Sequence, residues 1–580
     1  MNKYIYDVKN IFSILPKNLK KKFNLIFFLL SIGGLLETLG IGILIPLINI
    51  IISDNTKIPI LGNIINFDDF SKIQLIIILG AIIFLLYFVK AIYLSFLEFF
   101  IQKFSLRVNS EVTTQLFKTY LNNPYKFIFT NNSSVLFRNL TSEVSNFCAG
   151  IIEPLIMAAK EFFIISLIIS MLIAINYKIS LIIIIFSIIF FLIVKISLKK
   201  ILYELGKKEQ QYKGLVNKTM LEALQGFKFI KSYKIENIFV NNLYNILQGF
   251  IKIKYKSTAY RTLPRIWVEF FIILLLIILG IIFFFLGSNF SEFAVFVSIF
   301  LISMFKVMPS LISFTRVVNT FHNYKASINL IKSELNQHNY KSSIENKKIE
   351  KENLVENFDI IECKNLFFKY DSDDNPIINN LSLEIKRKEQ IIGICGPSGS
   401  GKTTLVDLLI GLLKPNDGNF YIDKKKVVTE ISKQQLFGYV PQNTFLFDDT
   451  IEKNILITTK DNQISSNNYL KVIKQSELYE FIQTLSDKDK TVIGENGVRI
   501  SGGQKQRIGI ARALISEPNI LIFDEATSAL DLETEKNIFK TIKLLSKNIS
   551  IIVISHNERI WNYCTHLYKL QEGKLIEKKI

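Results

Sequence analysis

The stretch GPSGSGKTT, residues 396–404, decides how this sequence is interpreted. It follows the apolar run IIGIC and leads into the apolar run TLVDLLIGLL, so it joins a predicted strand to a predicted helix. Glycines let backbone N–H groups turn toward phosphate oxygens, and the dipole of the following helix favours an anion at the same place. In this context the spacing predicts a phosphate-binding loop; the alternative is a glycine-rich turn with no ligand.

The loop predicts ATP and Mg²⁺ as ligands. Lys402 is expected to reach the β and γ phosphates, and Thr403 is expected to bind Mg²⁺. The residues expected to surround the phosphates are Gly396, Pro397, Ser398, Gly399, Ser400, Gly401 and Thr404.

Two further apolar strands end in polar residues that suit the same chemistry. One is ILIFDE, residues 520–525, and the other is IIVISH, which ends at His556. Because parallel strands present their carboxyl ends at one edge of a sheet, these residues should lie near the phosphates. We expect Asp524 to bind Mg²⁺, Glu525 to act as the base for the attacking water, and His556 to orient that water. An acid pair that caps a helix and a surface histidine are the alternatives.

The chain before residue 325 consists largely of long apolar runs. The whole protein has 580 residues, 49% of them hydrophobic, and a formal net charge of +19. Apolar runs of about 20 residues can cross a membrane as helices. Lysines and arginines gather in the loops between these runs, which predicts that the N-terminus, both long loops and the C-terminal region are cytoplasmic. We therefore expect a membrane, and not nucleic acid, as the partner. The six predicted spans lie near residues 24–52, 74–100, 152–175, 179–197, 267–287 and 292–314.

These features predict a multidomain membrane protein. Residues 1–325 form a six-helix, all-α transmembrane domain, and residues 326–356 are a polar linker. Residues 357–580 alternate strand-like and helical runs, which predicts an α/β P-loop NTPase domain with a largely parallel sheet. The four cysteines are scattered and predict neither a disulfide framework nor a metal site.

The stretch ISGGQKQR, residues 500–507, completes a resemblance to ATP-binding-cassette (ABC) exporters in which the membrane and ATPase domains are fused as one half-transporter. The family usually has Leu where this chain has Ile500. The resemblance implies that the loop closes on ATP held by the P-loop of a second ATPase domain. It therefore implies a dimer, most simply a homodimer, that buries two ATP molecules. The implied ATP contacts in this loop are Ser501, Gly502, Gly503 and Gln504.

The same resemblance assigns roles to four other places. It implies that Tyr370 stacks on adenine, although an ordinary strand tyrosine is the alternative. It implies that Gln442 senses and binds Mg²⁺ and contacts the membrane domain. Glu495 matches an acidic loop before the signature, and the SALD stretch, residues 528–531, matches a loop that crosses the dimer interface.

Two loop segments are candidates for coupling the ATPase to the membrane helices. Residues 122–130 contain NNPY, which should break a helix, and residues 224–236 contain Gly226. In the family such segments form short crosswise helices that lie on an ATPase domain. Simple polar loops are the alternative.

Two stretches and one acidic residue of the membrane half bear on the cargo. Glu37 lies midway through the first span, so it should face the protein interior or a wet cavity, in a functional or a purely structural role. The stretches ETLGIGILIPLI and LNNPY resemble bacterial flippases of lipid-linked oligosaccharides. That resemblance implies outward movement of a lipid or lipid-linked substrate across a bacterial inner membrane. Export of peptide or drug-like cargo, and an ATP-gated channel or sensor, are the alternatives.

Overall fold

The computed structural model describes most of the chain in two compact units. One unit contains Met1–Asn122 and Ser133–Lys341, and the other contains Asn123–Asn132 and Ser342–Ile580. Each unit is described separately. The described residues are 11–53, 71–127, 131–175, 177–285, 358–370, 375–424, 426–427, 436–459, 465–526, 531–556 and 558–578, with scattered residues between 297 and 335.

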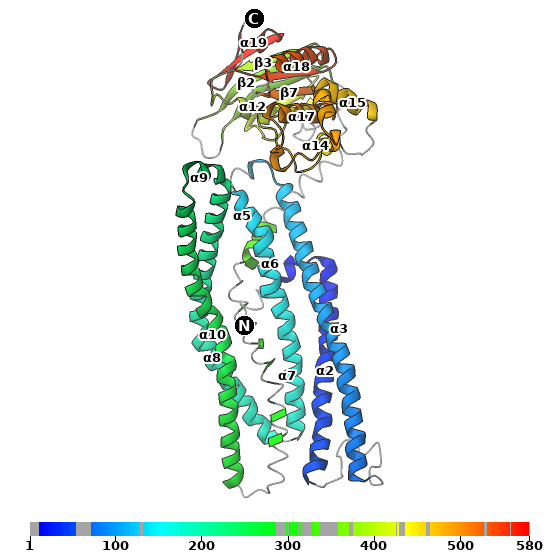
Figure 1. The fold of residues 1–580 in the computed structure, drawn as a ribbon, viewed down its shortest axis with the longest axis vertical. Helices are drawn as coiled ribbons and strands as arrows, with labels where there is room; N and C mark the ends of the chain where they lie inside the picture. The colour runs from blue at the N-terminus through cyan, green and yellow to red at the C-terminus, as the bar shows by residue number, and fades with distance from the viewer. Residues whose placement is uncertain are drawn as a thin grey trace. The chain divides into compact units, whose positions relative to one another are not determined.

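The first unit is built from long helices (Figure 1). A helix bonds its own backbone groups, which is why long apolar runs adopt this form in a membrane. Two π-helical turns, Asn139–Glu143 and Cys148–Ile152, interrupt the run that leads into α7. The helices are α2 (Lys17–Ser53), α3 (Lys72–Leu121), α5 (Ser133–Arg138), α6 (Val144–Phe147), α7 (Glu153–Ile175), α8 (Tyr177–Gln225), α9 (Phe227–Tyr233) and α10 (Glu236–Phe285).

Three helical stretches among the described residues are long and apolar enough to cross a membrane: Lys17–Ile48, Lys72–Leu121 and Val135–Met171. They agree with the first three predicted spans. The fourth and fifth predicted spans lie on α8 and α10, and their crossing stays a prediction. The sixth, residues 292–314, falls largely outside the described residues.

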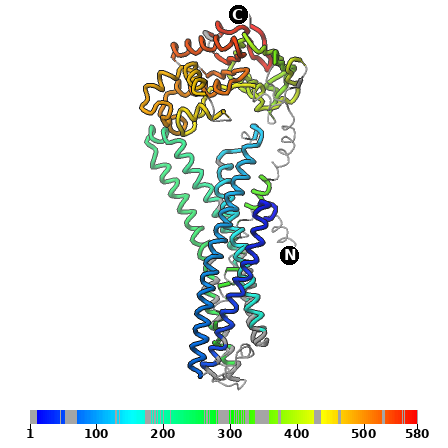
Figure 2. The backbone as a smooth tube through the Cα atoms, turned by 90° about the vertical axis from the view of Figure 1, so that its right-hand side faces the viewer, coloured from blue at the N-terminus to red at the C-terminus, as the bar shows by residue number. Residues whose placement is uncertain are grey.

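Several helices are much longer than a bilayer needs. At 1.5 Å per residue, the 50 residues of α3 extend about 75 Å, against a hydrocarbon core of about 30 Å. The helix ends at Leu121, directly before the predicted break at residues 122–125, which is thereby confirmed. Helices α8 and α10 pack side by side, and the seven-residue α9 joins them inside the predicted segment 224–236 (Figure 2).

The second unit is centred on a six-stranded sheet with the order β10-β9-β3-β8-β7-β6. All neighbouring strands pair in parallel except β10 with β9, so the prediction of a largely parallel sheet is confirmed. Ile520 and Ile522 of β7 enter one hydrophobic core, and Leu521 and Phe523 enter the other. The strands are β3 (Ile391–Cys395), β6 (Phe437–Val440), β7 (Ile520–Asp524), β8 (Ser550–Ile554), β9 (His566–Gln571) and β10 (Lys574–Lys578).

A second sheet of four antiparallel strands, in the order β2-β1-β4-β5, was not predicted. Its strand β2 alternates buried and exposed residues along most of its length, as expected for a sheet with one wet face. An alternation of strand-like and helical runs predicts a parallel sheet and does not indicate antiparallel strands. The strands are β1 (Ile360–Phe368), β2 (Ile378–Lys386), β4 (Asp417–Ile422) and β5 (Lys426–Val427).

The helices of the second unit cover the two cores. Helix α12 contributes Leu405 and Leu409 to the core that also contains β1 and β2, and α17 and α18 contribute to the other. This packing fixes the strand ends that carry the polar residues. The helices are α12 (Lys402–Leu409), α14 (Ile451–Leu456), α15 (Ser466–Gln475), α16 (Tyr479–Thr484), α17 (Gly502–Leu514), α18 (Leu532–Leu545) and α19 (Glu558–Trp561).

Candidate nucleotide site

The predicted phosphate loop lies between β3 and α12, and two of its glycines are required by its backbone. Gly401 is the N-cap of α12 with φ +95°, and a Cβ there would lie 2.7 Å from Ile377 Cγ2. A Cβ on Gly396 would lie 2.6 Å from the carbonyl oxygen of Leu570. Any larger residue at either position would displace the loop or its neighbour.

Lys402 points back into this loop. Its side chain is buried, and its Nζ donates hydrogen bonds to the carbonyl oxygens of Gly396 at 3.0 Å and Pro397 at 2.9 Å. Ser400 Oγ is buried without a hydrogen-bond partner among the described residues. A buried hydroxyl and a held ammonium fit a phosphate group. The other loop residues divide into exposed Pro397, Ser398, Gly399 and Thr403, and buried Thr404.

Asp524 ends β7 and is buried, with 6% of its surface exposed. The hydroxyl of Tyr439, on β6, donates to Asp524 Oδ2 at 3.2 Å. Burial raises the pKa of Asp524 and the charge of Glu525 adds to the rise, while the Tyr439 hydrogen bond and Lys402 oppose it. A carboxylate in such a place gains from a nearby cation, so its chemistry fits Mg²⁺.

The carboxylate of Glu525 contacts two other predicted site residues, Gln442 and His556. Gln442 Nε2 donates to Glu525 Oε2 at 2.7 Å, and His556 Nε2 lies 3.0 Å from Glu525 Oε1. Gln442 follows β6 and His556 follows β8, so the ends of three neighbouring strands bring the group together. Glu525 has φ +49°, a strained conformation for a residue with a side chain, and its N–H donates to the Ile554 carbonyl at 2.9 Å.

Tyr370 follows β1 and is half-buried. Its ring packs edge-on against Phe368, with ring centroids 5.0 Å apart and an angle of 86° between the planes. This contact holds an aromatic face at the rim of the second unit's core. Its predicted stacking on adenine stays a prediction.

The signature residues form a separate group at the start of α17. Ser501 is the N-cap: its Oγ accepts a hydrogen bond from Gln504 N at 3.2 Å, and Gln504 Oε1 accepts one from Ser501 N at 2.8 Å. Gly502 and Gly503 are the first residues of the helix. This reciprocal cap fixes a helix N-terminus that is open to an anion. Of the SALD stretch, residues 528–530 lie outside the described residues.

Sequence reasoning missed two residues near Asp524, Tyr439 and Asp407, and gave Tyr125 of the NNPY stretch no place beside Asp407. Asp407 lies on the buried face of α12, and burial together with the charge of Asp524 raises its pKa to about 6. Tyr125, from the loop segment that belongs to this unit, packs against the core, and burial and its proximity to Asp407 and Tyr370 raise its pKa. An acid within the apolar run LVDLL could have drawn attention to Asp407. Nothing local marks Tyr439, and NNPY indicates a helix break at Tyr125 without indicating this contact.

In the first unit, Glu37 faces the protein interior as expected. Its Oε2 lies 2.7 Å from Lys90 Nζ of α3, and both residues are buried. Lys90 Nζ also lies 4.6 Å from the centroid of the Tyr87 ring. The carboxylate is thus held in an ion pair between two helices, and a role in transport stays a prediction.

Known proteins share both halves of this chain. The family model of the ABC transporter transmembrane region matches residues 23–308, and the ABC transporter model matches residues 378–528. An ATP-dependent lipid A-core flippase of Pseudoalteromonas translucida is 28% identical to this chain, over 80% of this chain and 79% of the flippase chain. The Escherichia coli alpha-hemolysin translocation ATP-binding protein HlyB is 42% identical over 34% of this chain and 28% of its own.

A solved structure, that of a bacterial Atm1-family ABC exporter with ATP bound, has the same fold. Its TM-score is 0.76 at 20% identity, covering 97% of this chain and 95% of that one. The model of the transmembrane region matches the first part of the chain, and the model of the ATPase domain matches the part that follows it. The chain therefore belongs to the ABC transporter family, as an exporter that couples ATP hydrolysis to transport.

Proposed function

We propose that a homodimer of this chain, in the inner membrane of a bacterium, uses ATP to move a lipid or lipid-linked oligosaccharide outward. The similarity to a lipid A-core flippase over 80% of the chain carries the proposal, because it extends over both halves. The similarity to the alpha-hemolysin translocation protein favours peptide cargo but covers only 34% of the chain. In this arrangement residues 1–325 cross the membrane, residues 326–356 link the domains, and residues 357–580 with the N-terminus lie in the cytoplasm.

The proposed chemistry is hydrolysis of ATP to ADP and phosphate. Glu525 takes the proton of the attacking water. Gln442 and His556 hold the Glu525 carboxylate in place. Lys402 and the loop N–H groups bind the phosphates. Thr403, Asp524 and Gln442 would hold Mg²⁺, which neutralises phosphate charge when bound.

Two exposed features of the chain fit the binding of a second copy. The signature group at the start of α17 needs a nucleotide held elsewhere, which the P-loop of a partner would supply. Helix α9 exposes three aromatic side chains: Phe227 and Phe229 at 58% and Tyr233 at 66%. Aromatic residues gathered on one short helix are typical of a docking surface, and we assign this one to the partner's ATPase domain.

ATPase activity of the purified protein in lipid nanodiscs, with and without lipid-linked oligosaccharide, tests the proposal. We expect the glycolipid to stimulate hydrolysis severalfold, and Glu525→Gln to lower kcat by at least about 100-fold. Glu577→Gln is the matched control, because that glutamate is exposed on the edge strand β10. Hydrolysis that ignores the glycolipid would contradict the cargo and favour peptide or drug-like export. Absent hydrolysis in the wild-type dimer would instead favour the gated channel or sensor.

A further inference from the structure

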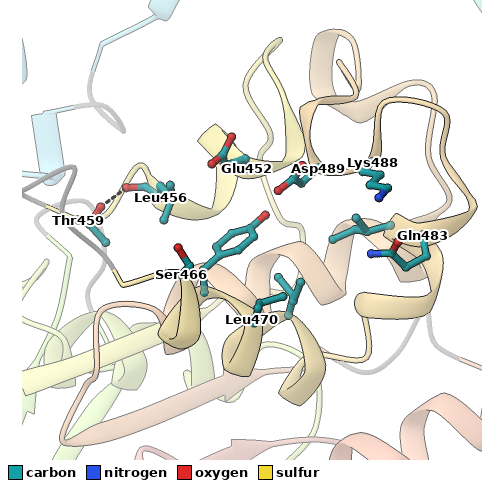
Figure 3. A pocket seen from close by; sticks show the side chains of 11 residues that line it. Glu452, Leu456, Thr459, Ser466, Leu470, Gln483, Lys488 and Asp489 are labelled. Carbon is teal, nitrogen blue, oxygen red and sulfur yellow. Dashed lines mark hydrogen bonds between the residues drawn. The ribbon is translucent and has the colours of Figure 1, made fainter.

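A cavity of about 370 Å³ lies in the second unit between α14, α15, α16 and the short turn Lys488–Lys490 (Figure 3). None of the residues that line it belongs to the proposed nucleotide site. Helices α14 and α15 both pack on α17, the helix that begins at the signature. The lining residues are Glu452, Leu456, Thr459, Ser466, Tyr469, Leu470, Ile473, Ile482, Gln483, Lys488 and Asp489.

The cavity contains a buried hydroxyl without a partner. Tyr469 Oη is shielded from solvent, and no group among the described residues forms a hydrogen bond with it. Asp489 and Glu452 line the same cavity as Tyr469. Burial raises the pKa of Tyr469, and the negative charges of these two carboxylates add to the rise. A buried polar group left unbonded destabilises the folded protein, and that cost is avoidable. Because Tyr469 lines the cavity, a rotation of its side chain on binding would bring this hydroxyl to a ligand, and the new hydrogen bond would remove that cost.

The lining combines charged and apolar side chains. The carboxylates of Glu452 and Asp489 come from different elements and lie on the same side of the cavity, and Leu470 lies on the opposite side (Figure 3). Two carboxylates and the ammonium of Lys488 leave this lining with one net negative charge. A single positive charge on a ligand would balance it.

We propose that this cavity binds a small organic monocation, a primary amine with an apolar body. The ammonium group donates to the carboxylates of Glu452 and Asp489 and to the hydroxyl oxygen of Tyr469. The apolar body packs on Leu470 and Ile473. The cavity volume is at the small end of the range for ligand sites, about 300–1,000 Å³, which suits a compact amine.

Isothermal titration of the full-length protein in nanodiscs tests this proposal, with empty nanodiscs as the blank. The probe is phenethylammonium chloride; 2-phenylethanol is its neutral analogue and phenylacetate its anionic one. We expect saturable binding of one amine per chain, and at least tenfold weaker binding of both analogues. Asp489→Asn and Tyr469→Phe should each weaken amine binding at least fivefold.

The matched control is Asp487→Asn, because Asp487 is exposed, lies two residues from Asp489 and does not line the cavity. It should bind the amine as the wild type does. Basal ATPase activity of each variant establishes that it is folded. The proposal is overturned if the amine does not bind saturably, if 2-phenylethanol binds equally well, or if Asp489→Asn leaves the affinity unchanged. A cavity that holds water alone would give the first result.

Discussion

At Asp407, burial and the neighbouring charge of Asp524 act in the same direction, and the pKa rises from 3.8 to about 6. The folded protein thus binds a proton at this site more tightly than the unfolded chain. Stability from this group is fully present below about pH 4 and is lost as the pH rises through about 6. Asp407→Asn should therefore stabilise the protein by about 1–3 kcal/mol above pH 6, and by nothing below about pH 4.

Thermal unfolding of the Asp407→Asn variant between pH 4 and pH 8, in EDTA and without nucleotide, measures this difference. Asp448→Asn, at an exposed position of the same unit, is the control and should show no such window. An Asp407→Asn variant that is less stable than the wild type at pH 8 would show that the carboxylate is stabilising in its charged form.

Alanine substitutions at two glycines of the phosphate loop should distinguish the cost of backbone strain from the cost of steric contact. Gly399 and Gly401 both have positive φ, +79° and +95°, but a Cβ on Gly399 meets nothing within 4 Å, whereas one on Gly401 meets Ile377 at 2.7 Å. Gly399→Ala should cost about 1–2 kcal/mol from strain alone. Gly401→Ala should cost at least about 1 kcal/mol more because of the added contact. Thermal unfolding without ATP ranks the two variants, and equal losses would mean that Ile377 moves aside freely.

At the scale of elements, the ion pair of Glu37 and Lys90 joins α2 to α3 inside the membrane domain. Removing one partner leaves a buried charge unbalanced, which in soluble proteins costs about 3–5 kcal/mol. Lys90→Met should therefore destabilise the protein more than the double variant Glu37→Gln/Lys90→Met. Melting temperatures of the wild type, the two single variants and the double variant in nanodiscs form a double-mutant cycle. Lys103→Met, at an exposed lysine of the same helix, is the control and should have little effect. Additive losses in the cycle would mean that the pair does not couple the helices.

Elements specified by local sequence could be predicted, and those specified by distant contacts could not. The phosphate loop, the end of β7 and the break after α3 each follow from a short stretch of residues. The antiparallel sheet depends on β1 pairing with β4, about 55 residues away. The Tyr439–Asp524 hydrogen bond and the Glu37–Lys90 pair likewise join residues far apart in sequence. Lys90 lies within the second predicted span, residues 74–100, but the sequence does not show that Glu37 is its partner.

At the scale of the whole molecule, the proposed homodimer makes the P-loop and the signature of one chain serve different nucleotides. The sequence implied this arrangement only through its resemblance to a family, because no local pattern says which copy supplies the signature. The capped start of α17 and the exposed aromatic residues of α9 suit a partner chain. A test must therefore distinguish a site completed by the partner from one completed within a single chain.

Mixed dimers make that distinction. One chain carries Lys402→Ala and the other Ser501→Ala, and two affinity tags select the mixed dimer. If the P-loop of each chain meets the signature of the other, both defects fall in one site and the second site stays intact. The mixed dimer should then hydrolyse ATP measurably, at up to about half the wild-type rate, whereas either variant alone as a homodimer is at least about 100-fold slower.

The reciprocal control pairs a wild-type chain with one that carries both substitutions. In the partner-completed arrangement each site now has one defect, so this dimer should be inactive. In a site completed within one chain the wild-type copy would remain active, and the first mixed dimer would be the inactive one. The two dimers contain the same two substitutions in the same numbers, so stability and expression cannot account for opposite activities. Activity in the second dimer and not in the first would contradict the partner-completed site, because only a chain that combines its own Lys402 with its own Ser501 could produce it.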